Sequence, residues 1–384
     1  MIKYNYGKQD ISNRDILAVN KVLRSDFITQ GKEIENFEKK LSKYFGFKYS
    51  TVTSSGTAAL HLAGKILKWK KNDVILVSAN TFLASANCSE YCGSKTDFID
   101  IDKNDYNICI KSLEKKLYNL KEKKITVNTV IVTDFAGHPA KWREINKLKK
   151  KYKFFLINDN CHAMGSKYFG KKEYSSKYAD LSILSFHAVK SITCGEGGAL
   201  LTNNKQKAGL AKLYRSHGVV KKSYHQLDML ELGYNYRITD FQCALGISQL
   251  SQINKFVLKR RKIAQMYNKF LLSNHLVKPK EFGKIYHSYH LYVVLINFKK
   301  LRINKEEFIN LLKKFGVKTQ IHYKPIYLNT YYQKKYKLNK NYCPESISYY
   351  SKCLSLPIYT SLNQYDIRFI SRKINFLIKK YAKE

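Results

Sequence analysis

Residues 185–198 read SFHAVKSITCGEGG and follow the short apolar run LSIL at 181–184. The run is typical of a buried strand that ends at Ser185, and the glycine-rich turn leads into a second apolar run at 198–203. Lys190 lies between the two runs. A lysine held at the end of a core strand and partly removed from water has a lowered pKa, which suits Schiff-base chemistry. The alternative is a solvated loop lysine, which is the better expectation for a typical lysine in so lysine-rich a chain.

Similar apolar runs recur through the first two thirds of the chain and alternate with segments of helical spacing. The strand-like runs are YSTVTSS (49–55), DVILVSA (73–79), NTVIVTDF (128–135), FFLIND (154–159), LSILSF (181–186) and GALLTN (198–203), and the helical segments are KEIENFEKKLSKYF (32–45), TAALHLAGKILK (57–68) and KWREINKLKKKY (141–152). This alternation predicts an α/β layered fold with a mostly parallel sheet. Active sites in such sheets lie at the C-terminal ends of strands, where this chain has its unusual polar residues.

The pattern changes from about residue 246 onward. The segments that follow are the basic, helical SQINKFVLKRRKIAQMYNKFLL (251–272), then SYHLYVVLINF (288–298), the helical KEEFINLLKKF (305–315) and the strand-like KTQIHY (318–323). A chain of 384 residues is long enough for one large core and a smaller one. We therefore predict a large α/β domain over residues 1–245, including an N-terminal segment that contacts substrate, and a smaller C-terminal α+β domain over residues 246–384.

The formal charge of +40 at pH 7 is extreme for a chain of this length. Taken alone it suggests a nucleic acid, an anionic membrane surface or an anionic substrate as partner. The basic residues are mostly lysine, however, and they are spread along the whole chain rather than gathered in one arm or stripe. This distribution favours compositional drift, so we expect no nucleic-acid binding. A basic nucleic-acid-binding protein stays as the alternative of another class.

Membrane and metal signatures are weak in this sequence. No apolar run reaches the roughly 18 residues of a membrane span, and the polar N-terminus MIKYNYGKQDISNRD (1–15) lacks the apolar core of a signal peptide. None of the eight cysteines forms a C-x-x-C pair, which disfavours a zinc knuckle or a thioredoxin-type redox motif. We expect a cytoplasmic protein with reduced cysteines, no metal site and no membrane insertion.

The segment TVTSSGTAALHLA (51–63) combines a strand end, a Ser-Ser-Gly-Thr turn and the start of an alanine-rich helix. Free backbone N–H groups and the positive dipole end at a helix start bind phosphate well. Gly56 lets the backbone approach a ligand closely, and Ser55 and Thr57 add hydroxyl donors. The alternative is an ordinary helix N-cap. The segment is not a Walker loop, because no G-K-[ST] follows it.

The segment FFLINDNCHAMGS (154–166) places Asp159 at the end of a buried apolar run. A carboxylate there needs a partner, so we expect either a counter-ion to a cationic group or a helix cap. His162 follows three residues later and by itself carries little weight. Asp159, Lys190, Ser185 and the phosphate-binding turn together match what pyridoxal phosphate (PLP) needs, because its aldehyde takes a lysine, its pyridinium nitrogen a carboxylate and its phosphate a helix N-terminus with hydroxyls.

Five motifs resemble those of one enzyme family over nearly the whole chain. They are SSGTAAL (54–60), DNCHAMG (159–165), SFHAVKSITCGEGGALLTN (185–203), YRSHG (214–218) and LGYNYRITDFQCALG (232–246). They are similar to the DegT/DnrJ/EryC1/StrS sugar aminotransferases. The resemblance implies the PLP-dependent aspartate aminotransferase fold (type I), with a large, mostly parallel sheet domain and a smaller C-terminal α+β domain, and it implies transamination. A branch of the family replaces the lysine by histidine and dehydrates its substrate, and this chain keeps Lys190.

The resemblance also implies which residues contact the ring of the cofactor. Lys190 forms the Schiff base and moves the proton between the cofactor and the sugar. Asp159 pairs with the pyridine nitrogen, and His162 lies near the ring 3-hydroxyl. Phe82, in ANTFLASAN (79–87), stacks on the ring.

The phosphate of the cofactor has its own implied ligands. Gly56, Thr57 and Ser185 hold it, next to the hydroxyl of Ser55. Asn235, in GYNYR, reaches the phosphate of the neighbouring subunit, which implies a homodimer with shared active sites.

Three further segments, YNYGKQDIS (4–12), SDFITQGKEIENFE (25–38) and QIHYKPIY (320–327), resemble one branch of the family. Its members aminate the 4-keto group of a UDP-linked 2-acetamido-2,6-dideoxy-hexos-4-ulose for pseudaminic acid biosynthesis, usually with glutamate as amine donor. The residues then implied to line the substrate pocket are Tyr6, Asp26, Phe27, Ile28, Thr29, Gln320, Ile321, His322 and Tyr323. An aminotransferase acting on another nucleotide-linked 3- or 4-keto sugar stays as the alternative within the class.

Overall fold

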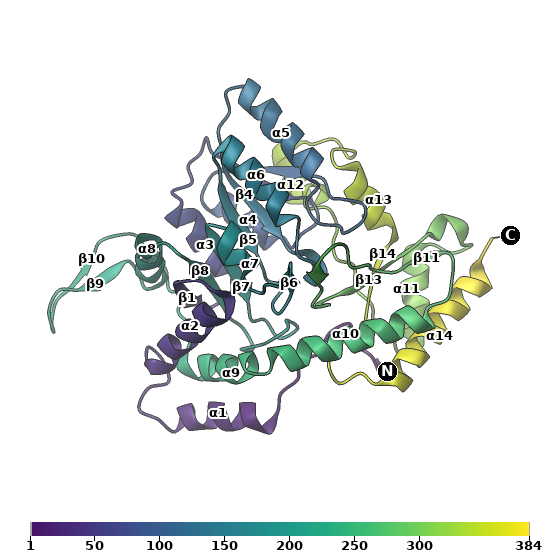
Figure 1. Cartoon of the computed structure of the whole chain (residues 1–384), viewed down its shortest axis with the longest axis horizontal. Coiled ribbons are helices and arrows are strands. Elements are labelled where there is room, and N and C mark those ends of the chain that lie inside the picture. The colour runs from purple at the N-terminus through teal and green to yellow at the C-terminus, as the bar shows by residue number, and fades with distance from the viewer. Residues whose placement is uncertain (1, 384) are drawn as a thin grey trace.

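A seven-stranded sheet forms the centre of the chain, for which the computed structural model describes residues 2–383 (Figure 1). In spatial order its strands are β1 (Tyr49–Thr53), β8 (Gly198–Thr202), β7 (Leu181–Ser185), β5 (Phe155–Asp159), β4 (Val127–Thr133), β2 (Val74–Ser78) and β3 (Lys95–Ile99). From β7 to β3 all neighbours are parallel, whereas β8 is antiparallel to both β7 and β1. All the apolar runs predicted as strands in the first two thirds lie in this sheet, so the predicted α/β fold is confirmed.

Helices cover both faces of this sheet. One face packs against α3 (Gly56–Ile66), α4 (Ala84–Tyr91) and α8 (Lys205–Arg215), and the other against α2 (Lys32–Phe45), α5 (Ile110–Glu122), α6 (Trp142–Tyr152), α7 (Tyr174–Tyr178) and α9 (Asp240–Leu250). The side chains of β2 alternate between them, since Ile75 and Val77 pack with α3 and α4 whereas Val74 and Leu76 pack with α5 and α6. Because both faces are buried, the strands read as continuous apolar runs.

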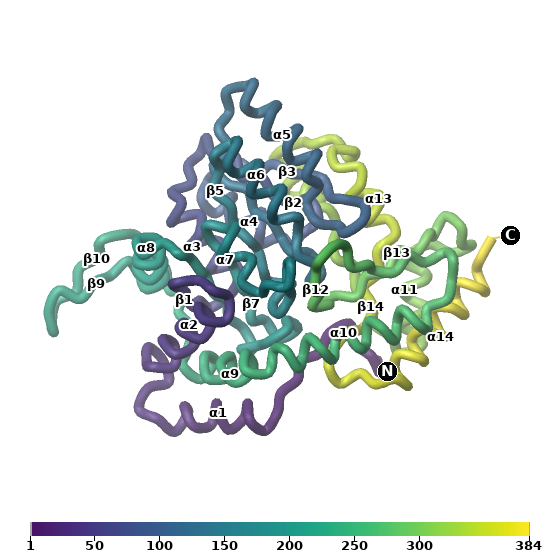
Figure 2. The backbone as a smooth tube through the Cα atoms, viewed as in Figure 1, coloured from purple at the N-terminus to yellow at the C-terminus, as the bar shows by residue number. Residues whose placement is uncertain are grey.

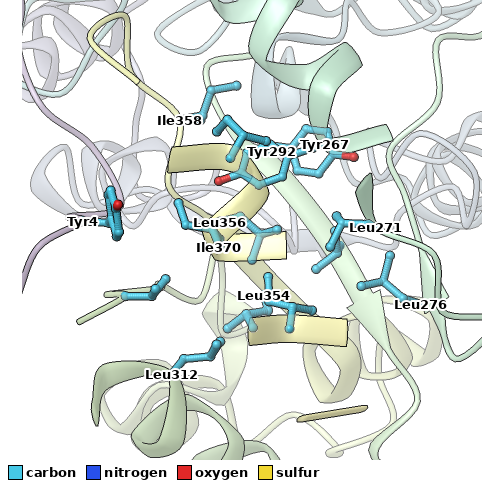
Figure 3. Close-up of a cluster of buried hydrophobic side chains, with 14 of the residues drawn as sticks. Tyr4, Tyr267, Leu271, Leu276, Tyr292, Leu312, Leu354, Leu356, Ile358 and Ile370 are labelled. Carbon is cyan, nitrogen blue, oxygen red and sulfur yellow. The ribbon is translucent and has the colours of Figure 1, made fainter. Parts of the chain in front are cut away.

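A second, antiparallel sheet forms in the C-terminal part of the chain. It consists of β11 (Leu276–Val277), β13 (Tyr292–Ile296) and β14 (Cys353–Leu356), and it packs with α10 (Ile253–Phe270), α11 (Lys305–Lys314) and α14 (Gln364–Tyr381). Figure 3 shows Tyr267, Leu354 and Ile370 in the core between them. Tyr4 belongs to the same core, and its backbone N–H donates to the Gly316 oxygen at 2.9 Å. The N-terminal end of the chain therefore lies beside α14 (Figure 2).

Helix α10 takes part in both cores. Phe256 and Val257, in its first half, pack beneath the large sheet with α2 and α9. Ile263 and Tyr267, in its second half, pack in the core of the small sheet. A domain division at residues 245/246 stays a prediction, and it falls inside α9, the helix that precedes this shared helix.

Residues 318–323 were predicted to be strand-like, and this prediction is wrong. The segment has only an isolated bridge, in which the backbone N–H groups of Gln320 and Ser355 donate to each other's oxygens at 3.2 and 2.8 Å. Beyond it the Tyr323 N–H donates to Asn80 Oδ1 at 3.0 Å, and the His322 oxygen accepts from the Tyr349 hydroxyl at 2.7 Å. Side-chain partners thus satisfy the backbone groups that a strand would pair in a ladder.

The segment after residue 323 returns to the large sheet. Ile326, Tyr327 and Tyr332 pack there against Ala79 and Phe98. The elements not yet named are α1 (Asn13–Leu23), η1 (Phe135–Gly137), β6 (Lys167–Tyr168), β9 (Val219–Lys221), β10 (Leu227–Met229), β12 (Ile285–Tyr286), η2 (Phe298–Lys300), η3 (Ile326–Leu328), α12 (Thr330–Tyr336) and α13 (Pro344–Lys352). Among the helices within residues 2–383, none is long and apolar enough to cross a membrane. All eight cysteines are free thiols.

Candidate active site

A cavity of about 500 Å³ opens where β5 and β7 end. The predicted site residues that line it are Tyr6, Ser55, Gly56, Thr57, Phe82, Asp159, His162, Ser185, Lys190, Gln320, Ile321, His322 and Tyr323. These residues come from both ends of the chain and from its middle. The fold therefore brings together most of the residues that the sequence singled out, at the carboxyl edge of the parallel strands.

The start of α3 forms one wall of the cavity. The Ser55 hydroxyl caps the helix by accepting the Ala58 N–H at 3.1 Å, while the N–H groups of Gly56 and Thr57 precede the first intrahelical hydrogen bonds. A Cβ placed on Gly56 would lie 3.0 Å from the Ser185 Cβ. Glycine thus lets the Ser185 hydroxyl approach the positive end of the helix, an arrangement that fits a phosphate group. The N-cap alternative for Ser55 is realised at the same time.

Asp159 forms a second wall as the last residue of β5. It is 4% exposed, and its Oδ2 accepts from the Ser85 hydroxyl at 2.6 Å while its Oδ1 accepts from the Cys161 N–H at 3.2 Å. None of the ion pairs formed within residues 2–383 includes Asp159. A buried carboxylate without a protein cation at its side fits a ligand that brings positive charge, such as a protonated pyridine nitrogen.

Lys190 lies half-buried in the wall of the cavity, on the turn after β7. Its backbone N–H donates to the His187 oxygen at 2.9 Å, which closes this turn. Burial lowers the pKa of the Lys190 ammonium, against a smaller opposite effect of Cys161 and Asp159. A larger fraction of the side chain is then the neutral amine, which is the form that attacks an aldehyde.

His162 and Tyr323 form a pair at the cavity wall. The Ala136 N–H donates to His162 Nδ1 at 3.4 Å, and His162 Nε2 lies 3.1 Å from the Tyr323 hydroxyl. Burial, with a contribution from Lys190, lowers the pKa of His162 well below its ordinary value, so the ring is neutral. Because Nδ1 accepts the Ala136 N–H, we assign the single ring proton to Nε2, which then donates it to the hydroxyl oxygen of Tyr323. The hydroxyl hydrogen of Tyr323 is then left to donate to a ligand.

Phe82 is 52% exposed although it is a large aromatic residue at the cavity. Its ring centroid is 6.1 Å from that of Tyr323. A half-exposed aromatic face beside Asp159 and Lys190 fits the stacking of a flat ring.

The opposite side of the cavity is made by the N-terminal segment and by residues 320–323. The Tyr6 ring lies 5.6 Å from the ring of His322, and the backbone carbonyl oxygen of Tyr6 accepts from the Ile358 N–H at 3.2 Å. His322 Nδ1 is 2.8 Å from the Ser355 hydroxyl. These contacts attach two loops to the small sheet, and together the loops leave room for a larger substrate next to Asp159 and Lys190.

The structure places the other predicted residues away from the cavity of their own chain. Residues 26–29 lie beside the start of α9, where the Ile28 oxygen accepts from the Asp240 N–H at 2.9 Å. Phe27 is 65% exposed. Asn235 is exposed and forms an isolated bridge with Ser216. A role of these residues in a pocket stays a prediction.

Other lining residues were missed by the sequence reasoning. They are Leu60, Thr81, Ala84, Thr133, Cys161, His187, Val189, Glu196 and His290. Thr133 ends β4 and pairs in register with Asp159, so the rule that polar strand ends gather at one edge would have found it. His290, whose ring lies 4.5 Å from that of His162, comes from the C-terminal third, and no local signal marks it.

Comparisons with known proteins cover nearly the whole chain. The model of the DegT/DnrJ/EryC1/StrS aminotransferase family matches residues 9–375. A Campylobacter jejuni protein named UDP-4-amino-4,6-dideoxy-N-acetyl-beta-L-altrosamine transaminase is 40% identical over 381 residues, which are 98% of either chain.

Solved structures resemble the fold over a similar length. Helicobacter pylori PseC, described as an aminotransferase involved in the biosynthesis of pseudoaminic acid, has a TM-score of 0.92 at 30% identity and covers 98% of this chain and 100% of its own. A Streptococcus pneumoniae protein solved in its PLP-form has a TM-score of 0.89 at 24% identity, with 99% and 100% covered, and shows the fold alone.

The family model and the two relatives at 30% identity or more extend from the N-terminal segment to the last helix. They include the turn that carries Lys190 and the strand that ends at Asp159. The family resemblance and the aminotransferase fold predicted from the motifs are thereby confirmed. The chain belongs to the DegT/DnrJ/EryC1/StrS aminotransferase family.

Proposed function

We propose that this enzyme transfers an amino group, with PLP as cofactor and glutamate as donor, to the 4-keto carbon of a UDP-linked 2-acetamido-2,6-dideoxy-hexos-4-ulose. The products are 2-oxoglutarate and a UDP-linked 4-amino-4,6-dideoxy sugar for pseudaminic acid biosynthesis. The observation that carries the proposal is the gathering of Lys190, Asp159 and the start of α3 around one cavity. The names of the Campylobacter and Helicobacter relatives support the choice of sugar.

The residues present fit PLP in three independent ways. The start of α3, with Ser55, Gly56, Thr57 and Ser185, fits the phosphate, and the buried carboxylate of Asp159 fits the ring nitrogen. The exposed face of Phe82 fits the ring. When bound, PLP supplies an electron-accepting ring that makes the carbon carrying the amino group acidic.

The protein side chains supply binding and proton transfer in this proposal. The neutral Lys190 amine would hold the aldehyde carbon of PLP and, when free, would carry the proton at its Nζ between substrate and cofactor carbons. Asp159 would hold the ring nitrogen through its negative charge. The Tyr323 hydroxyl donates a hydrogen bond to a ligand oxygen, with His162 fixing its direction.

We propose further that the active form is a homodimer with shared active sites. Asn235 and residues 26–29 are exposed and outside the cavity of their own chain, as expected of residues that complete the site of a partner. The β9–β10 hairpin projects from the body of the chain (Figures 1 and 2). Its Leu227 and Met229 are exposed. Such apolar exposure on a projecting arm fits an interface between copies of this chain.

Absorbance spectroscopy of the purified protein tests the reaction. We expect bound PLP to give a visible band that bleaches when glutamate is added and returns when the UDP-linked 4-keto sugar is added. Return of the band with another nucleotide-linked keto sugar, but not with this one, would establish the alternative substrate. A protein that stays colourless with excess PLP, and that binds DNA with an affinity falling steeply with salt, would contradict the proposal and favour the nucleic-acid-binding alternative.

The shared site has its own test. Asn235→Ala and Lys190→Ala subunits, mixed and reassembled, restore activity in one of the two sites of a mixed dimer if Asn235 serves the partner. Mixtures that stay as inactive as each variant alone would contradict the shared site. The cytoplasmic location stays a prediction, which fractionation of cells tests.

A further inference from the structure

Three buried hydroxyl groups form a chain that ends on the Asp159 carboxylate. The Ser85 hydroxyl donates to Asp159 Oδ2 at 2.6 Å. Thr81 Oγ1 lies 3.2 Å from Ser85 Oγ and 2.7 Å from Thr133 Oγ1. All four side chains are at most 4% exposed, so bulk water does not replace these hydrogen bonds.

The donor and the acceptor of each hydrogen bond in the hydroxyl chain follow from counting hydrogens. A carboxylate only accepts, so the one hydrogen of Ser85 points to Asp159. Thr81 must then donate to Ser85, and Thr133 must donate to Thr81. Hydroxyl groups aligned in this way polarise one another, and each strengthens the next hydrogen bond toward the charge.

Three separate elements hold the chain in place. Thr133 is the last residue of β4 and pairs in register with Asp159 at the end of β5. Thr81 and Ser85 are four residues apart, and Ser85 lies in the first turn of α4. The hydroxyl chain therefore connects two strand ends with a helix; Thr81 and Thr133 line the cavity, and Ser85 lies outside its lining.

We propose that Ser85 is a positioning residue for Asp159, and that Thr81 and Thr133 extend its effect by aligning its hydroxyl. The chain fixes the orientation of the carboxylate and supports its negative charge, which is the property that a cationic ring nitrogen requires. The inference rests on the proposed function, because it gives the hydroxyl chain a role in the binding of PLP. No covalent or proton-transfer step is added to the reaction.

Removal of the hydroxyl tests the proposal in the Ser85→Ala variant. The first measurement is the dissociation constant of PLP from the apoprotein, which we expect to rise at least about tenfold, the effect of one hydrogen bond to a charged group. The second is the pH midpoint of the visible band of the bound cofactor. We expect it to rise, because a ring nitrogen that keeps less positive charge makes the nearby lysine-linked nitrogen more basic.

A graded series separates this effect from simple packing. Thr133→Val acts at the far end of the chain and should shift both quantities in the same direction but less than Ser85→Ala. Thr133→Ser keeps the hydroxyl and should restore wild-type values. The matched control is Ser89→Ala, which removes another fully buried hydroxyl from α4 that bonds the Ala86 oxygen at 2.6 Å. It should change thermal stability only.

The nearby titratable groups are the same in all these variants. They are Cys88, Cys161, His162, Lys190 and Tyr323, so a moved midpoint reports on Asp159. Wild-type protein that takes up no PLP would overturn the proposed function itself. Wild-type protein that binds PLP, together with a Ser85→Ala variant that matches Ser89→Ala in both measurements, would overturn the positioning role alone. If Ser85→Ala does not fold, Thr81→Val and Thr133→Val give the same two readouts.

Discussion

The cavity has two sides that the chain builds in different ways. The sheet side consists of Gly56, Asp159 and Ser185, which lie on strand ends and on a helix start of one buried sheet. The loop side consists of Tyr6 and residues 320–323, which lie on irregular segments far apart in the sequence. Hydrogen bonds to distant partners, such as that of the Tyr323 N–H with Asn80, hold the loop side in place.

Because of this difference, we expect the sheet side to serve the chemical steps and the loop side to select the sugar. The sheet side cannot shift without disturbing a core that is covered on both faces, so it suits the groups that must be the same for every substrate. The loop side can change its side chains with little effect on the core, so it suits groups that distinguish one sugar from another. Substitutions on the sheet side should therefore affect both half-reactions, and those on the loop side should affect mainly the sugar.

Replacement of Lys190 by alanine should have the largest effect. We expect turnover to fall at least about a thousandfold with every amine donor and acceptor, because one change removes both the proposed nucleophile and the proposed proton carrier. The measurement is the rate of 2-oxoglutarate formation from glutamate with PLP in excess.

A second lysine provides a matched control for this experiment. Burial also lowers the pKa of Lys305, which is half-buried near Cys353 and outside the cavity. Lys305→Ala should keep near wild-type turnover per folded molecule. Normal turnover in Lys190→Ala would contradict the proposal, and equal losses in both variants would point to a general effect of removing a buried lysine.

Tyr323→Phe tests the point where the two sides meet. The hydroxyl accepts from His162 on the sheet side and belongs to a residue of the loop side, and burial raises the pKa of Tyr323 well above its ordinary value, which keeps it a donor. We expect kcat to fall by about tenfold to a hundredfold, the effect of one hydrogen bond to a charged oxygen. Stopped-flow absorbance of each half-reaction measures it.

Tyr267→Phe is the control for the loss of a buried tyrosine hydroxyl. Tyr267 donates to the Pro357 oxygen at 2.8 Å in the core of the small sheet. Its replacement should lower thermal stability and leave both half-reactions unchanged. If Tyr323→Phe behaves in the same way, Tyr323 fills space in the cavity and donates no hydrogen bond to a ligand.

The sequence predicted the sheet side far better than the loop side, for a physical reason. Asp159, Ser185 and Lys190 follow short apolar runs, and parallel strands bring their carboxyl ends to one edge, so local pattern is sufficient. Residues 318–323 look like a strand, yet Asn80 and Tyr349 supply partners for their backbone groups that no local pattern announces.

The family resemblance reached residues that physical reasoning from one sequence could not. It placed Tyr6 and His322 at one cavity although more than 300 residues separate them. Residues 26–29 and Asn235 lie outside the cavity of the folded single chain, so their roles rest on the resemblance alone. Ser85 was missed because a serine in the first turn of a helix has no pattern that connects it with a strand end elsewhere.

Tyr6→Phe should have a smaller effect, confined to the sugar. The ring that contacts His322 is kept and only the hydroxyl is lost, so we expect KM for the UDP-linked sugar to rise about threefold to tenfold. The rate of bleaching by glutamate should change less than twofold, within about 0.4 kcal/mol. Equal changes in both half-reactions would show that the loop side takes part in the chemistry, and the separation of the two sides would then be wrong.

The smallest effect is expected at Glu90, whose hydrogen bonds hold the helix that follows the loop side. The Glu90 carboxylate, on α4, accepts from Thr96 at 2.7 Å, from Tyr336 at 2.6 Å and from Tyr331 at 2.9 Å, and it pairs with Lys335. It thereby attaches α12, which follows residues 320–323, to the large sheet. Burial alone would raise the pKa of Glu90, but these hydrogen bonds outweigh it and lower the pKa below its ordinary value.

The sign of the pH dependence follows from that lowered pKa. A carboxyl group with a lower pKa in the folded state stabilises the fold above the pKa of the unfolded chain, about 4.3 for Glu, and this contribution is lost as the pH falls through the folded value. Glu90→Gln should therefore lower Tm at pH 7 and make less difference near pH 4, as differential scanning calorimetry measures. Its effect on kcat should be under about threefold, because no catalytic group moves.

The control Glu35→Gln removes an exposed helix pair with Lys39 and should change Tm little at either pH. A Glu90→Gln variant whose Tm deficit is as large at pH 4 as at pH 7 would show that Glu90 stabilises the fold through packing rather than through its charge.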